Sequence, residues 1–132
     1  MTLDELFEEI DNDFNITFEN LAEKIYKVPA LHSKYLRLFF THKTKLNKYN
    51  EELNKLYKQK YYYFTEEYEY KLDNAKEINF HIYSDEEYCK LNTRVENQKV
   101  LVDCLDRTLK KVQYLTQDIK NIQNHLNYVN GV

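Results

Sequence analysis

Residues 101–129 read LVDCLDRTLKKVQYLTQDIKNIQNHLNYV and contain the clearest structural pattern in the chain. Apolar residues recur there in alternating steps of four and three, the heptad spacing of a helix that packs against other helices. The pattern predicts one long helix over residues 85–130, which ends at Asn130-Gly131. The apolar seam consists of Leu101, Leu105, Thr108, Val112, Leu115, Ile119, Ile122, Leu126 and Val129.

A second apolar stripe lies on the first half of this helix, formed by Leu91, Val95, Val102 and Leu109. A helix with two apolar faces needs two neighbours, because an uncovered apolar face is unfavourable in water. We therefore predict that the helix also mediates self-assembly. An intramolecular hairpin of two long helices is the alternative. The residues predicted to form the oligomer interface are Leu101, Leu105, Val112, Leu115, Ile119, Ile122 and Leu126.

A second long helix is predicted over residues 29–72. Pro29 marks its start, because proline lacks an N–H and disfavours helical geometry in the residue before it. The apolar spacing again alternates between four and three until the stripe reaches Lys60. The residues of this stripe are Tyr35, Phe39, His42, Leu46, Tyr49, Leu53 and Leu56.

Shorter elements complete the predicted fold. Residues 1–28 predict one or two short helices, the first capped by Thr2 with Glu5 and the second capped by Thr17. Residues 73–84 predict a connection, extended at residues 79–83, and Ser84 with Glu87 predicts a capping box before the last helix. The expected fold is all-α: a single helical domain, residues 1–132, of short N-terminal helices and two long antiparallel helices, assembled as a ring-like homo-oligomer.

Composition supports long helices and limits the class of protein. The 132 residues include one glycine and one proline, too few for the many turns of a compact β fold. The acidic N-terminus does not resemble a signal peptide, and no apolar run approaches the roughly 20 residues of a membrane span. Cys89 and Cys104 are 15 residues apart on the predicted last helix, too far to form a disulfide with each other. Two unpaired cysteines fit a reducing, cytosolic setting.

Charge is distributed unevenly around a net value of −3. Residues 1–23 and 66–87 are strongly acidic, whereas residues 24–65 contain ten basic residues against Glu51 and Glu52. Charge asymmetry of this kind can mark an interaction surface. It is also compatible with acidic and basic helices that simply pair with one another.

The basic segment ends in KLYKQKYYYF, residues 55–64. Lysines that can contact phosphates stand beside tyrosines that can stack on bases, the usual chemistry of single-stranded nucleic-acid binding. Solvated lysines and half-buried tyrosines on a helix are the plainer interpretation. The candidate DNA-binding residues are Lys55, Lys58, Lys60, Tyr62 and Tyr63, with Lys58 and Lys60 on the sugar-phosphate backbone and Tyr62 or Tyr63 stacked on bases. The sequence leaves open whether Lys43, Lys45 and Lys48 join them.

No pattern in the sequence indicates an enzyme. There is no metal-binding spacing of cysteine and histidine, no acidic calcium loop and no glycine-rich phosphate loop. The four histidines are scattered along the chain. We therefore expect no catalytic residue, no metal and no cofactor.

Three stretches resemble the UvsY recombination mediators of tailed phages: TLDELFEEI (residues 2–10), LHSKYL (31–36) and KQKYYY (58–63). LVDC (101–104) and DIKNIQ (118–123) are more loosely similar to the helix that the family uses to assemble. The resemblance implies a ring-like homo-oligomer of six or seven subunits that binds single-stranded DNA through the lysine–tyrosine stretch. It implies a non-catalytic role in homologous recombination, repair and recombination-dependent replication.

The same resemblance implies the partners. Such mediators weaken the hold of the phage single-strand-binding protein on DNA and help the phage recombinase to nucleate its filament, in the cytoplasm of the infected bacterial host. No membrane is involved. The competing hypothesis from the residues alone is a coiled-coil scaffold or adaptor protein with no affinity for nucleic acid, whose tyrosines lie in the core.

Overall fold

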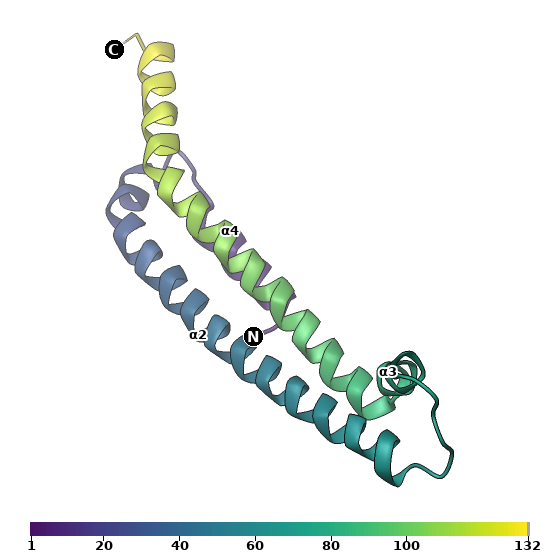
Figure 1. Cartoon of the computed structure of the whole chain (residues 1–132). Helices are drawn as coiled ribbons and strands as arrows, with labels where there is room; N and C mark the ends of the chain where they lie inside the picture. Colours follow the sequence, from purple (N-terminus) through teal and green to yellow (C-terminus); the bar gives the residue numbers. More distant parts are fainter. Residues whose placement is uncertain (132) are drawn as a thin grey trace. The chain divides into compact units, whose positions relative to one another are not determined.

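The computed structural model describes residues 1–131, which form four α-helices and one short π-helix (Figure 1). The α-helices are α1 (Leu3–Asp13), α2 (Leu21–Tyr62), α3 (Ala75–Ser84) and α4 (Glu86–Val129), and the π-helix η1 (Tyr63–Glu67) directly follows α2. Residues 1–131 contain no β-strand. The prediction of an all-α fold with two long helices is confirmed.

The chain divides into two compact units, and each contains part of both long helices. The first unit comprises residues 1–41 and the residues from 101 onward, and the second comprises residues 42–100. Within each unit, a segment of α2 runs antiparallel beside a segment of α4 (Figure 1). The predicted antiparallel arrangement of the long helices is therefore present inside each unit.

The core of the first unit joins three helices. Leu6 of α1, Tyr35 of α2, and Leu105 and Ile119 of α4 have no exposed surface and belong to one hydrophobic cluster. The apolar spacing of α4 produces this core because residues three and four apart lie on one side of a helix. α1 begins as the sequence predicts, since the Thr2 hydroxyl accepts from the Glu5 N–H at 3.2 Å and the Glu5 carboxylate accepts from the Thr2 N–H at 3.0 Å.

Most of the second apolar stripe of α4 is covered within the chain, although Leu91 is only half-buried. Leu109 is buried in the same cluster as Leu6, so α1 provides α4 with a neighbour in addition to α2. Val102 and Val95 are also buried. In the first unit, the second apolar face of this helix therefore does not by itself require a partner subunit, because the short N-terminal helix packs there.

Helix α2 begins earlier than the sequence predicts, at Leu21 instead of Pro29. Proline inside a helix removes one hydrogen bond, here the one that would end on the carbonyl of Ile25. Pro29 is exposed, so its side of the helix faces water, whereas Leu21 and Leu31 on either side of it are buried in the core. Burial of this continuous apolar side outweighs the local cost of the proline.

Helix α2 also ends earlier than the predicted residue 72. It stops at Tyr62 and continues as one turn of π-helix, in which the Tyr68 N–H donates to the Tyr63 carbonyl at 2.8 Å. The wider turn brings Phe64 into the core of the second unit. A π-helical turn cannot be read from a heptad pattern, because its hydrogen bonds span five residues instead of four.

The predicted connection over residues 73–84 is wrong, because α3 occupies most of it. Asn74 caps this helix by accepting from the Glu77 N–H at 3.0 Å. Ile78 and Ile82, four residues apart, bury one face of α3 against Phe64. β-branched and aromatic residues suggested an extended segment, but this packing stabilises a helix instead.

Helix α4 starts at a different cap from the predicted one. Asp85, not Ser84, accepts from the Tyr88 N–H, at 3.0 Å, and Ser84 is the last residue of α3. An aspartate at this position accepts the free N–H groups of the first turn as a serine would. The predicted end of α4 is confirmed, since Gly131 adopts a positive φ of 70° just beyond the last turn.

A polar contact lies between the long helices in the second unit. The side-chain amide of Gln98 donates to the His42 carbonyl at 2.9 Å, and the same nitrogen lies 3.2 Å from His42 Nδ1. Both side chains are buried. A buried polar pair of this kind fixes the register of the two helices, because a shift would leave both groups without partners.

Candidate nucleic-acid interface

The C-terminal part of α2 presents one exposed face with lysine and tyrosine side chains. Lys55, Lys58, Gln59 and Tyr62 are separated by three, four and seven residues and therefore share a side of the helix. All four are exposed, and Tyr62 keeps 59% of its surface. We call this set the lysine–tyrosine face. Cations and a free aromatic ring stand together on it, as a single-stranded nucleic-acid site requires.

A groove of about 420 Å³ lies along this face. Tyr57 forms part of its wall and is fixed there by a hydrogen bond from its hydroxyl to Asn79 Oδ1, at 2.6 Å. The Tyr57 ring also packs 6.2 Å from the Tyr61 ring, centroid to centroid. Tyr57 is therefore held in place on one side of the groove, against the partly exposed ring of Tyr61. The residues that line the groove are Tyr57, Lys58, Tyr61, Tyr62, Thr65 and Glu66.

Tyr63 occupies a different environment from Tyr62. It is the first residue of η1, and its ring packs edge-on against Phe64 at 5.0 Å and against Tyr68 at 6.0 Å. Those contacts place Tyr63 at the margin of the second unit's aromatic cluster. Of the two tyrosines that the sequence offers for base stacking, Tyr62 is therefore the more accessible.

Lys60 does not lie on the lysine–tyrosine face. Two residues along a helix turn the side chain through about 200°, so Lys58 and Lys60 point to different sides. The Lys60 ammonium contacts Glu87 at 3.0 Å and Asp85 at 3.3 Å, and its side chain is only 21% exposed. The hydrogen bond with Glu87 and the contact with Asp85 raise the pKa of Lys60 above its usual value.

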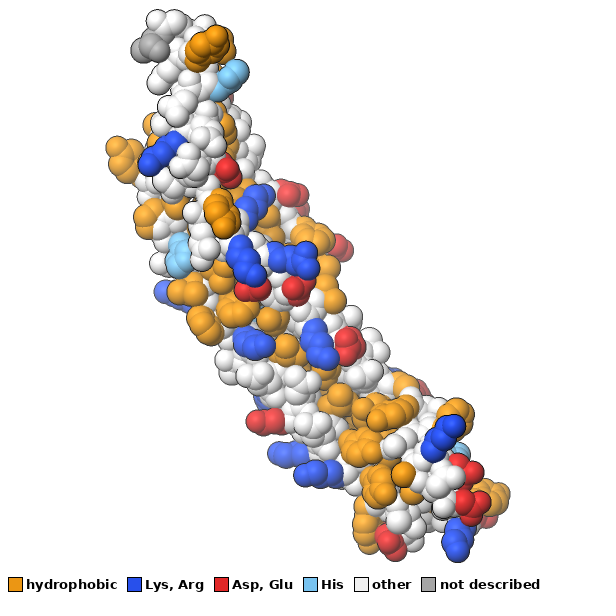
Figure 2. Space-filling model, turned by 45° about the horizontal axis from the view of Figure 1, so that its top comes forward, with side chains coloured by type: hydrophobic (Ala, Val, Ile, Leu, Met, Phe, Trp, Pro, Cys, Tyr) orange, Lys and Arg blue, Asp and Glu red, His pale blue; other side chains and the backbone are white. Residues whose placement is uncertain are grey.

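Lys43, Lys45 and Lys48 are exposed on α2. The Lys45 ammonium lies 5.8 Å from the centre of the Tyr49 ring, and the Arg94 guanidinium of α4 lies 5.7 Å from the same centre. Sequence reasoning missed Arg94, because its place beside α2 depends on the register of the two helices. On the surface drawn in Figure 2, basic side chains lie singly or in small groups among hydrophobic and acidic ones.

The residues predicted to form the oligomer interface fall into two groups. Ile122 is 38% exposed and Leu126 is half-buried, and exposed Tyr128 and Val129 follow them at the end of α4. The other five are buried in the core of a single chain. They could meet another subunit only if the first unit opened. These five are Leu101, Leu105, Val112, Leu115 and Ile119.

The LHSKYL stretch has a structural role in the first unit. Lys34 and the hydroxyl of Tyr35 both donate to Asp13 Oδ2, at 2.6 and 2.7 Å, and Lys34 also pairs with Glu9. Burial and the bond to Asp13 raise the pKa of Tyr35, so its hydroxyl remains a donor. This network attaches the end of α1 to α2.

Within residues 1–131, no group of three or more histidine, cysteine, aspartate or glutamate side chains is placed to hold a metal ion. No helix in that range is both long and apolar enough to cross a membrane. The end of α2 in the second unit combines exposed lysines, an exposed tyrosine ring and a groove.

A sequence model of one protein family, described as "Recombination, repair and ssDNA binding protein UvsY", matches residues 9–132. The chain belongs to the UvsY family. UvsY proteins are non-enzymatic DNA-binding proteins of recombination and repair, and this membership confirms the expectation that the chain is not an enzyme. A search of curated proteins finds no match to the chain.

Solved structures of a UvsY protein share the fold. The recombination mediator protein UvsY of bacteriophage T4, in its type IV lattice, matches with a TM-score of 0.85 and 22% identity, over 97% of this chain and 98% of that chain. The type II lattice gives a TM-score of 0.83 and 20% identity, over 98% of both chains. The likeness thus extends over nearly the whole of both chains and establishes the fold.

Proposed function

We propose that this chain is a recombination mediator that binds single-stranded DNA through the lysine–tyrosine face of α2. The observation that supports this site most directly is the exposure of Lys55, Lys58 and Tyr62 on one side of the helix. Family membership supplies the role in recombination and repair. A helix face with both cations and a free ring suits a strand whose bases are unpaired.

The residues have different roles in this proposal. Lys55 and Lys58 contact the sugar-phosphate backbone, and Tyr62 stacks on a base beside the groove lined by Tyr57 and Tyr61. Tyr63 contributes at the margin of the site. Lys60 takes part only when its ion pairs with Asp85 and Glu87 exchange for a phosphate.

The protein acts on DNA that is already covered by a single-strand-binding protein. It weakens the hold of that protein and helps the phage recombinase to nucleate its filament, during homologous recombination, repair and recombination-dependent replication. Its place of action is the cytoplasm of the infected bacterial host. The family resemblance is the support for these partners, and the family is one of recombination, repair and single-stranded DNA-binding proteins.

Assembly into a ring-like homo-oligomer of six or seven subunits makes a modest site effective. A few lysines and one stacking ring per subunit give weak binding, but later contacts on the same strand are intramolecular and therefore much more favourable. The exposed apolar end of α4, with Ile122 and Leu126, is the surface that we propose for this assembly. The five buried residues of the seam support it from within the subunit.

Fluorescence anisotropy of labelled oligonucleotides, measured over a series of salt concentrations, tests the DNA site. We expect tighter binding to the single strand than to the duplex, with log affinity falling by about 0.7 per neutralised phosphate for each unit of log salt concentration. Lys58→Ala should weaken binding and reduce this slope. Tyr62→Ala should weaken binding by about 1–3 kcal/mol with the slope unchanged.

Two exposed residues away from the face provide matched controls. Lys76→Ala on α3 removes one lysine charge, and Tyr114→Ala on α4 removes one tyrosine ring. Neither should change the affinity. Absence of binding at low salt would refute the proposed function and favour a helical scaffold. Unchanged binding by both Lys58→Ala and Tyr62→Ala would refute the site.

A further inference from the structure

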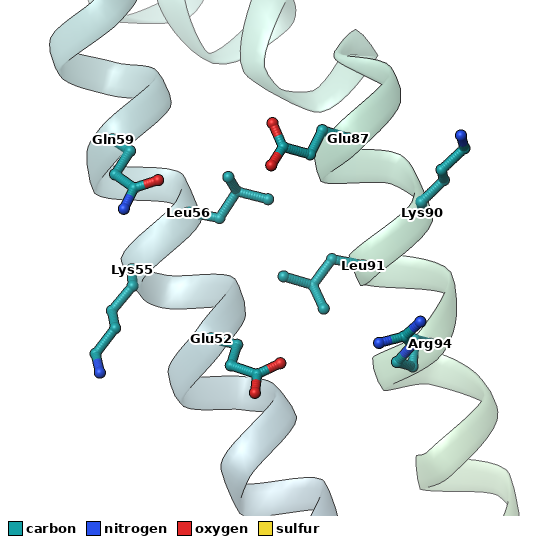
Figure 3. A pocket seen from close by; sticks show the side chains of 8 residues that line it. All are labelled: Glu52, Lys55, Leu56, Gln59, Glu87, Lys90, Leu91 and Arg94. Atoms are coloured by element: carbon teal, nitrogen blue, oxygen red, sulfur yellow. The ribbon is translucent and has the colours of Figure 1, made fainter.

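A second groove, of about 400 Å³, lies between α2 and α4 in the second unit, and we call it the α2–α4 groove. Leu56 of α2 and Leu91 of α4 point toward each other across it (Figure 3). Lys55 and Lys90 lie at the outer sides of the two helices in the same view. The floor of the groove is therefore apolar, Lys55 and Lys90 flank it from the outer sides of α2 and α4, and Glu52 and Glu87 point into it.

Arg94 connects the two sides of this groove. It extends from α4, and its guanidinium lies 5.7 Å from the centre of the Tyr49 ring of α2. Among the described residues it forms no ion pair, so its charge is not already neutralised. Stacking on a ring leaves the edge of a guanidinium free to donate two parallel hydrogen bonds, the geometry that a phosphate accepts.

The carboxylates in the groove do not cancel these cations. Glu87 is held by the Lys60 ammonium at 3.0 Å, which removes much of its repulsion toward an anion. Lys90 pairs with Glu86 at 3.2 Å, but both side chains are largely exposed, and an exposed pair of this kind is weak and exchanges easily. Glu52 is the carboxylate that remains to oppose a phosphate in the groove.

Lys55 belongs to both surfaces. It lies on the lysine–tyrosine face with Lys58 and also lines the α2–α4 groove. A backbone bound at Lys58 and Lys55 therefore reaches the mouth of the groove without leaving the protein. Beyond it, Arg94 and Lys45 stand around the same Tyr49 ring and continue the line of positive charge.

We propose that the bound DNA strand passes from the lysine–tyrosine face into the α2–α4 groove, where Arg94 binds a phosphate and the Leu56–Leu91 floor receives a base or sugar. This inference rests on the proposed function and extends its site to α4. It also predicts a preference for single strands, because the bases of a duplex are paired and stacked and are not free to enter a groove between two helices. The last helix then contributes to DNA binding as well as to the core.

Arg94→Ala in the full-length protein tests the inference, with the same labelled single strand and salt series. We expect roughly a three- to tenfold loss of affinity and a salt slope smaller by about 0.7, as for one lost phosphate contact. Arg107→Ala is the matched control, because Arg107 is an exposed arginine on the same helix and pairs with Asp103 at 3.0 Å. It should leave both quantities unchanged.

Glu52→Gln tests the same path through an expected gain of DNA affinity instead of a loss. Removal of the opposing carboxylate should raise the affinity, whereas Glu96→Gln, an exposed carboxylate on α4 that pairs with Lys99, should not. Arg94→Lys should recover only part of the binding, since lysine keeps the charge and loses the planar fork. Equal thermal unfolding midpoints for the Arg94 variants and the parent would exclude a loss of folding as the cause.

The outcomes separate the inference from the proposed function. If Lys58→Ala weakens binding while Arg94→Ala and Glu52→Gln leave affinity and slope unchanged, the strand does not enter the groove, and the inference is overturned while the mediator function stands. If the parent protein does not bind single-stranded DNA at all, the function fails first. A loss with Arg94→Ala together with a gain with Glu52→Gln would support the path.

Discussion

Lys58 and Lys60 illustrate how helical geometry separates residues that the sequence places together. In the printed sequence the two lysines alternate with glutamine and look like one basic patch. On α2 they point to different sides, so Lys58 faces solvent beside Tyr62 while Lys60 binds Asp85 and Glu87. Lys60 therefore links the end of α2 to the start of α4 and acts as a structural residue in the free protein.

Tyr35 provides a test of the network that attaches α1 to α2. Tyr35→Phe keeps the buried ring and removes the hydroxyl that donates to Asp13 at 2.7 Å. Loss of a hydrogen bond to a charged group should reduce the free energy of unfolding by about 1.5–3 kcal/mol. Urea denaturation measures this, and Tyr114→Phe, at an exposed position, serves as the control. Equal stability of the two variants would contradict the role of the network.

His42 predicts a pH dependence of stability. Burial lowers its pKa, and the Gln98 amide nitrogen beside Nδ1 suits the neutral ring. The unfolded chain therefore binds a proton more readily than the folded one. Stability is fully present above the unfolded pKa of about 6.5 and is lost as the pH falls toward the lower folded pKa, at up to about 1.4 kcal/mol per pH unit.

Denaturation curves between pH 7.5 and pH 5 measure this effect. His42→Gln removes the titrating group, and the fall in stability between neutral and acidic pH should become shallower. His125→Gln, an exposed histidine on α4, should leave the profile unchanged. A profile that is identical in the parent and the His42 variant would show that the buried ring does not titrate in this range.

At the scale of elements, α3 is stabilised by packing more than by sequence preference. Ile82 has no exposed surface and lies with Ile78 and Phe64 in the core of the second unit. Ile82→Ala should lower the free energy of unfolding by about 2–4 kcal/mol and speed hydrogen exchange in α3 and η1. Phe80→Ala, on the exposed side of α3, should have little effect on either. Equal hydrogen exchange in the two variants would contradict the conclusion that packing of Ile82 stabilises α3.

The existence of the two long helices was predictable from their periodicity, whereas the two ends of α2 were not. The heptad spacing of α4 and the Thr2–Glu5 capping box correctly indicated a long last helix and the start of α1. The start of α2 was missed because Pro29 is a strong local signal, yet the core residues around it keep the helix continuous. α3 was missed because it has few apolar residues, and their burial depends on contact with Phe64, which lies outside α3.

The candidate site was predictable to a similar degree. Lys55, Lys58 and Tyr62 could be found from local composition, because cations beside rings are visible in the sequence. The pairing of Lys60 and the position of Arg94 depend on which residues of α4 lie opposite α2. That register is set by contacts between residues far apart in the chain, such as His42 with Gln98, 56 positions apart, which a single sequence does not reveal.

At the scale of the whole molecule, Ile122 tests the proposed assembly. A charge at this half-exposed position, Ile122→Asp, should lower the mass in solution by separating subunits, while the helical circular dichroism signal is retained. Asn124→Asp introduces the same charge at an exposed polar position and should leave the mass unchanged. An assembly that survives Ile122→Asp would place the contact between subunits elsewhere.

The ion pairs of Lys60 also affect the thermodynamics of DNA binding. If a phosphate displaces Asp85 and Glu87 from this lysine, the two carboxylates become free and attract cations from the solvent. This uptake opposes the release of cations from the DNA. A lysine that begins in an ion pair therefore adds little to the net number of ions released. The salt slope of this protein should consequently report fewer phosphate contacts than its lysines would suggest.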